Sequence, residues 1–140
     1  MPPYTYIDHT SDLGIRVSGR NRSELFKNAS GAVFETMLVI GETKTLKTVE
    51  RSLDLKSSSL PELLVEWLRE LLFLFHTKQM VPQKANIRFR GHRQLKAKVT
   101  FLKLEKGYFR VKMEVKNVTY HNLKIRSTQA GYTATVIFDV

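Results

Sequence analysis

The chain has 140 residues, a mass of 16.2 kDa and a formal net charge of +10, which is the size of one domain with one hydrophobic core. Since 42% of the residues are hydrophobic and none is cysteine, we expect a folded domain over residues 1–140 without disulfide bonds, thiolate-bound metals or thiol nucleophiles. No apolar run is long enough for a membrane span and no signal peptide is recognisable, so we expect a cytoplasmic protein without a membrane partner.

The first part of the chain predicts two strands, a helix and a further strand. A short strand over Tyr4 to Ile7 is followed by a polar connection. Apolar residues then recur at every second position, which predicts a half-buried strand: Leu13, Ile15 and Val17. A capping-box spacing begins a helix after Asn21, which we expect to continue to Gly41. The next strand is expected from about Thr48 to Lys56.

The clearest element is a second helix, which begins after Ser59. Ser59 and Glu62 form another capping box, and Pro61 occupies the first turn, where it costs no hydrogen bond. The apolar residues of this helix follow at spacings of three and four, which places them on one wide face: Leu60, Leu63, Leu64, Trp67, Leu68, Leu71, Leu72 and Phe75. Phe73 and Leu74 lie off that face, so we expect the helix to end deep in the structure.

After Pro82 the pattern changes to an alternation of apolar and polar residues, which predicts strands. A hairpin turn is expected at Glu105–Gly107. The expected strands pass through five segments: Ile87–Phe89, Ala97–Phe101, Val111–Val115, Val118–Ile125 and Tyr132–Val140. Together these elements predict an α+β domain in which a mostly antiparallel sheet has two helices packed on one face.

The positive charge is concentrated in one stretch of the chain. Residues 84–126 contain 13 Lys and Arg but only two acids, Glu105 and Glu114, whereas the remaining residues contain 10 basic and 11 acidic ones. Such a stretch attracts polyanions, RNA above all. Alternating lysines also protect exposed sheet edges from aggregation. The charge of residues 84–126 therefore has three interpretations: RNA binding, binding to an acidic protein surface, or protection of exposed strands.

Signatures of catalysis are missing from the sequence, including the P-loop, the dinucleotide-binding glycine motif and the zinc motif His-Glu-x-x-His. Two acidic features remain. The first feature is the pair Asp8 and Asp12, which lie four residues apart. The second is Asp139, whose side-chain carboxylate lies next to the α-carboxylate of Val140. If the first and last strands meet in the sheet, these carboxyl groups converge and cannot all stay ionised without a cation or a pKa shift. Oxygen-only ligands favour Ca²⁺ or Mg²⁺ as the cation. The alternative is that the aspartates cap turns or pair with arginines.

Three separate motifs resemble those of the archease family. The segment from Tyr6 to Gly14, YIDHTSDLG, resembles the opening motif of that family. The segment from Glu114 to His121, EVKNVTYH, resembles its late strand motif, and Gly131 to Val140 resembles its C-terminal end. The order and spacing of the motifs and the two intervening helices match as well, so the resemblance covers essentially the whole chain.

The resemblance implies a non-catalytic, chaperone-like protein with an α+β fold that activates an RtcB-type RNA ligase in tRNA splicing and RNA repair. Such a protein promotes guanylylation and multiple turnover of the ligase. The resemblance also implies a divalent metal ion, Ca²⁺ in crystals, bound by Asp12, Asp139 and the carboxyl group of Val140. Four further residues are implied to support the site or to contact the partner: Asp8, His9, Lys116 and His121.

Two alternative functions follow from the residues themselves. The first is an RNA-binding module on the basic stretch, in which Tyr108, Phe109 and Tyr120 stack on bases. The second is a metal-dependent hydrolase with His9 or His121 as base, although neither a nucleophile nor an oxyanion-stabilising group accompanies these histidines. We therefore expect a ligase activator that is not itself an enzyme.

Overall fold

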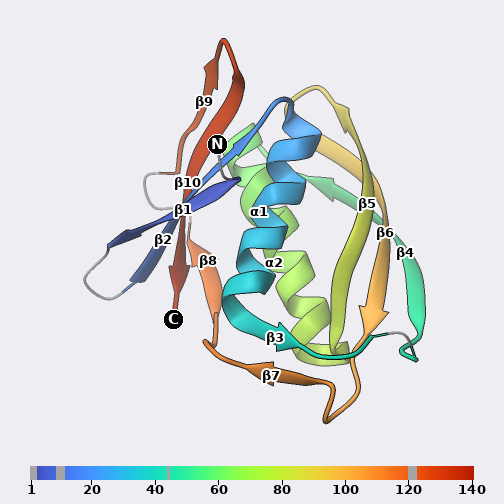
Figure 1. Ribbon diagram of the computed structural model, residues 1–140. Helices are drawn as coiled ribbons and strands as arrows, with labels where there is room; N and C mark the ends of the chain where they lie inside the picture. Colours follow the sequence, from blue (N-terminus) through green and yellow to red (C-terminus); the bar gives the residue numbers. More distant parts are fainter. Residues whose placement is uncertain (1–2, 9–11, 44, 120–122) are drawn as a thin grey trace.

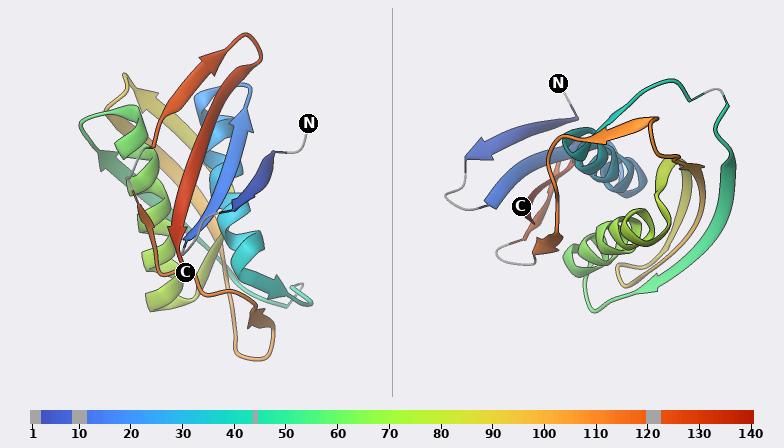
Figure 2. Two further views of the ribbon diagram at one scale, coloured as in Figure 1. Left: turned by 90° about the vertical axis from the view of Figure 1, so that its left-hand side faces the viewer. Right: turned by 90° about the horizontal axis from the view of Figure 1, so that it is seen from below.

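A computed structural model describes residues 3–8, 12–43, 45–119 and 123–140. Its strands form three sheets, and two helices lie between the two larger sheets (Figures 1 and 2). Each of these sheets therefore has the helices on one of its faces. The predicted fold class, an α+β domain with two helices and mostly antiparallel strands, is confirmed.

A five-stranded sheet brings the two ends of the chain together. Its strands are β1 (Tyr4–Asp8), β2 (Asp12–Gly19), β10 (Gly131–Asp139) and β8 (Asn117–Thr119) in that order, with β9 (Ile125–Thr128) also paired to β10. β2 and β10 are antiparallel from Tyr132 opposite Gly19 to Asp139 opposite Asp12. The apolar residues of this pair are buried: Ile15, Val17, Ala134, Val136 and Phe138. The condition under which the terminal acids converge, that the first strands meet the last one in the sheet, is therefore fulfilled by β2 and β10.

A three-stranded sheet lies on the other side of the helices. It consists of β4 (Thr48–Lys56), β6 (Gln94–Lys103) and β5 (Met80–Arg90) in that order, and a short pair, β3 (Leu38–Ile40) with β7 (Phe109–Val111), lies at one end of the domain (Figure 2). β4 has the predicted bounds. β5 begins before Pro82 rather than after it, and the register shifts between Pro82 and Lys84, since a proline offers no N–H to the neighbouring strand.

The helices begin at the predicted caps. α1 (Arg22–Met37) begins after Asn21, whose side chain accepts a hydrogen bond from the Glu24 N–H at 2.8 Å. α2 (Leu60–Lys78) begins after Ser59, whose hydroxyl accepts from the Glu62 N–H. The two helices are joined in the core, where Trp67 Nε1 donates to the Phe26 carbonyl at 3.0 Å. Neither of these described helices has the length and apolar character that crossing a membrane requires.

Two predictions about helix ends are wrong. α1 ends at Met37 and not at Gly41, because Leu38 is extended (φ −127°, ψ 146°) and begins β3, which pairs with β7. The end of α2 is not covered on all sides, because the side chain of Phe73 is 57% exposed. Leu74 is buried as expected.

The predicted strand through Val111–Val115 is also wrong beyond Val111. The N–H groups of Lys112 and Met113 both point to the Met37 carbonyl at the end of α1, so the chain leaves the strand path there. The turn at Glu105–Gly107 is present, with the Tyr108 N–H bonded to the Glu105 carbonyl, but β6 and β7 do not pair as a hairpin. β8 ends at Thr119 and β9 begins at Ile125, and residues 120–122 lie outside the described part of the chain.

Gly131 begins β10 and lies in close contact with Gly19 at the end of β2. Its φ is +133°, and a Cβ at this position lies only 2.2 Å from the Gly19 carbonyl oxygen. We expect Gly131→Ala to lower the free energy of unfolding by more than about 1 kcal/mol in urea denaturation. Gly91→Ala is the matched control, since Gly91 has a positive φ of +61° but open space around it. Equal destabilisation by both changes contradicts a special role for the contact with Gly19.

Candidate functional site

The two aspartates predicted to bind a metal lie directly opposite each other. Asp12 begins β2 and Asp139 ends β10, and the register of the two strands pairs them. Paired residues have their Cβ atoms about 4.5–5.5 Å apart and share one face of the sheet. Because the neighbouring Leu13 and Phe138 face the core, the two aspartates face away from the helices. Asp12 is half-buried and Asp139 is exposed.

Other predicted residues lie at the same end of the sheet, which we call the acidic end. Asp139 is paired with Asn117 on its other side, and the N–H of Lys116 donates to the Asp139 carbonyl at 2.8 Å. Lys116 is exposed, and Val140 is 39% exposed. The structure therefore brings Asp12, Asp139, Val140 and the backbone of Lys116 together from distant parts of the chain.

Three of the supporting positions are not fully described. β1 ends at Asp8, whose backbone is paired with Leu13 beside Asp12, but the side chain of Asp8 lies outside the described part. His9 and His121 lie outside it as well. Within the described residues, no three His, Asp or Glu side chains form a group that could hold a metal ion. The metal site with Asp12, Asp139 and Val140 therefore stays a prediction.

The chemistry of the acidic end follows from the opposed carboxylates. Like charges directly opposite each other on a sheet destabilise the pair by about 0.2–1 kcal/mol. A cation between them removes this repulsion, and carboxylate oxygens are the ligands that Ca²⁺ and Mg²⁺ prefer. The predicted donor set of Asp12, Asp139 and the Val140 carboxyl group therefore fits a hard divalent ion in type.

A second feature of the same sheet face was not predicted from the sequence. A shallow pocket of about 470 Å³, which we call the basic pocket, opens beside β2, β9 and β10; it is lined by Arg16, Lys124, Arg126, Thr133, Ala134 and Thr135. Lys124 and Arg126 belong to the basic stretch, but Arg16 does not. For Arg16, the only signal in the sequence was its outward position in the alternation of β2.

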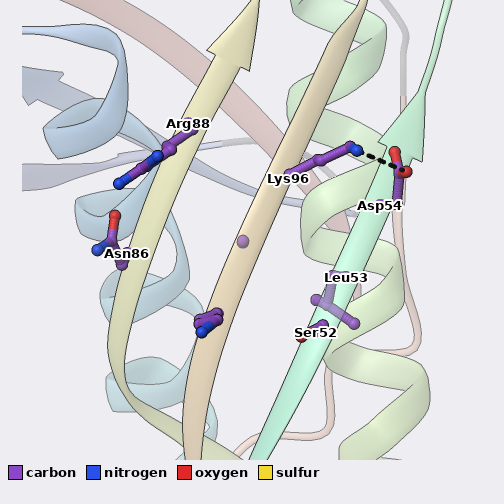
Figure 3. A pocket seen from close by; sticks show the side chains of 8 residues that line it. Ser52, Leu53, Asp54, Asn86, Arg88 and Lys96 are labelled. Carbon is purple, nitrogen blue, oxygen red and sulfur yellow. Dashed lines mark ion pairs between the residues drawn. The ribbon is translucent and has the colours of Figure 1, made fainter.

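The outer face of the three-stranded sheet carries another part of the basic stretch. A pocket of about 540 Å³ opens there, between Arg88 and Asn86 on β5, Lys96 on β6 and Asp54 on β4 (Figure 3). Lys96 forms an ion pair of 4.0 Å with Asp54. The charge that is contiguous in the sequence is therefore divided between two faces of the molecule.

Two of the three aromatic residues that were expected to stack on bases pack against the hydrophobic core instead. Tyr108 and Phe109 are partly buried and pack against core residues. The Phe109 ring lies edge-on to Phe75 at a centroid distance of 6.2 Å. Tyr120 lies outside the described residues. Base stacking by Tyr108 and Phe109 is therefore not supported by their packing.

Comparisons with known proteins agree over the whole chain. The model of the Archease protein family (MTH1598/TM1083) matches residues 4–140. The protein archease of Methanosarcina barkeri is 36% identical over 141 residues, which cover 98% of this chain and 95% of that protein. The protein archease of Archaeoglobus fulgidus is 32% identical over 142 residues, with 98% of both chains covered.

Two solved structures share the fold. The solution structure of protein 1598 from Methanobacterium thermoautotrophicum has a TM-score of 0.76 and 30% identity, with 100% of both chains covered. The crystal structure of an archease from Thermotoga maritima, described as a possible chaperone, has a TM-score of 0.69 and 24% identity, and the match covers 96% of this chain and 94% of that one. The second likeness concerns the fold alone.

The opposed carboxylates predict how Asp139→Asn changes stability. In EDTA at low salt, the variant is expected to unfold at the same or a higher temperature than the wild type, because one like charge is removed. Millimolar CaCl₂ should raise the unfolding temperature of the wild type and have much less effect on the variant. Glu50→Gln, on the outer face of β4, is the control and should keep the full response. Equal stabilisation of all three proteins by CaCl₂ places the ion elsewhere.

Proposed function

Since this chain belongs to the archease family, we propose that it is a non-catalytic protein cofactor that activates an RtcB-type RNA ligase in the cytoplasm. In this proposal it promotes the guanylylation and multiple turnover of the ligase in tRNA splicing and RNA repair. The observation that carries the proposal is the pairing of Asp12 with Asp139 at an exposed end of the sheet. The relatives that are at least 30% identical are named as protein archease and not as enzymes, which is compatible with a helper function.

The acidic end is the part of the molecule that we propose to dock at the ligase. Asp12, Asp139 and the carboxyl group of Val140 supply oxygen ligands for a divalent ion, Ca²⁺ or an ion of similar chemistry. When bound, such an ion supplies a positive charge that anionic nucleotide phosphates can approach. The aspartates would hold this charge at the end of the two central strands of the sheet, where burial of the opposite face fixes their position.

We propose that the remaining predicted residues either contact the partner or support the metal ligands. Lys116 is exposed and its backbone is bonded to Asp139, so its ammonium group can reach an anionic group that approaches the acidic end. Asp8 continues the same end on β1, and we propose that it supports the ligands. His9 and His121 belong to the same motifs and are proposed as further contacts.

The test is the guanylylation of an RtcB-type ligase, measured as incorporation of labelled GMP in a single turnover, with and without this protein. Substoichiometric wild-type protein is expected to accelerate both this step and multiple-turnover ligation. Asp139→Asn should reduce the acceleration at least about tenfold, as is typical when groups around a metal are changed, while Glu50→Gln retains it. Full acceleration by Asp139→Asn rules out a role for the acidic end, and no acceleration by the wild type contradicts the proposed function as a whole.

A further inference from the structure

The basic pocket is assembled by strand pairing from residues far apart in the sequence. Arg16 on β2 is paired with Thr135 on β10, and Arg126 on β9 is paired with Thr133 on β10. Lys124 completes the lining just before β9. The three basic side chains are exposed and the two threonines are half-buried. The hollow therefore has cationic groups along its rim and two hydroxyl-bearing residues within it.

No acidic group balances this charge in the described part of the structure. The residues that line the pocket include no aspartate or glutamate. The described ion pairs join Arg20 to Glu24, Arg69 to Glu66 and Lys96 to Asp54, and none involves Arg16, Lys124 or Arg126. A hollow that is lined by positive charges without nearby negative ones concentrates the positive electrostatic potential and attracts an anion.

The chemistry of the lining matches a phosphate group. Guanidinium groups bind phosphate oxygens through two parallel hydrogen bonds, and an ammonium group adds a point charge. Threonine hydroxyls can donate to a remaining oxygen. We propose that the basic pocket binds a phosphodiester group of an RNA strand. The choice of RNA over another polyanion rests on the proposed function, in which the partner enzyme acts on RNA.

The position of the pocket relative to the acidic end is consistent with this ligand. Arg16 and Asp12 lie on the same strand and the same face, four residues apart, which is about 13 Å. The Debye length is about 10 Å at 0.1 M salt, so the aspartates repel a phosphate in the pocket only weakly. A strand held in the pocket therefore lies beside the surface that we propose to dock at the ligase.

The outer face of the three-stranded sheet is the weaker candidate, although it carries more lysines and arginines. There Asp54 forms an ion pair with Lys96 (Figure 3). Glu50 lies on the same face of β4, four residues before Asp54. These acids offset part of the charge, whereas the lining of the basic pocket has none. This face therefore provides a charge-matched control for the pocket.

The test measures binding of a fluorescein-labelled single-stranded RNA oligonucleotide to the full chain by fluorescence anisotropy, without ligase, over a series of salt concentrations. The pocket variant carries Arg16→Gln, Lys124→Gln and Arg126→Gln. It is expected to bind at least about tenfold more weakly, and the slope of log K against log salt should fall by up to about 2, since each phosphate contact on a single strand contributes about 0.7. The control variant removes the same charge from the other face: Arg88→Gln, Lys96→Gln and Lys98→Gln.

The control variant should lose clearly less affinity than the pocket variant. Equal losses in both variants mean attraction to net charge only and overturn the proposal, as does an unchanged affinity of the pocket variant. Thermal unfolding checks that each variant folds, and the single change Arg16→Gln replaces the triple variant if it does not. Because the binding assay contains no ligase, and guanylylation is measured without RNA, failure of either proposal is distinguishable from failure of the other.

Discussion

The antiparallel pairing of β2 with β10 is the constraint on which the rest of the site depends. Its inner side buries five apolar residues, Ile15, Val17, Ala134, Val136 and Phe138. Burial of one large aliphatic side chain is worth about 1.5–3 kcal/mol, whereas two opposed like charges cost about 0.2–1 kcal/mol. Burial therefore sets the register, and the repulsion between Asp12 and Asp139 is tolerated. A slip by one residue turns the apolar set outward and is strongly disfavoured.

This register gives the outer face of the sheet two surfaces of opposite charge. The acidic end and the basic pocket use outward positions of the same two strands, with Asp12 and Arg16 on β2 and Asp139 and Thr135 on β10, and the pair of Gly14 and Ile137 lies between them. One rigid element therefore fixes the distance between them. In the functions proposed above, one surface meets the ligase and the other holds the RNA on which that ligase acts.

Local signals in the sequence predicted the elements that local interactions determine. The caps at Asn21 and Ser59 and the wide apolar face of α2 were recognisable because each depends on neighbours within a few residues. The end of α1 was not recognisable from the sequence, because the Met37 carbonyl accepts hydrogen bonds from the N–H groups of Lys112 and Met113, which are distant in the chain. The acidic end was predicted on the condition that the first and last strands meet, and the structure shows this meeting in the pairing of β2 with β10. The basic pocket could not be predicted, because Arg16 joins Lys124 only through β10.

In the proposed function Asp12 and Asp139 act as one unit, and a double-mutant cycle distinguishes this from two separate contributions. The stimulation of ligase guanylylation is measured for Asp12→Asn, Asp139→Asn and the variant with both changes. If the two carboxylates serve one site, each single change removes most of the stimulation and the double change removes little more, because residues that act together are not additive. Losses that multiply in the double variant show two independent contributions and contradict a single site shared by the two carboxylates.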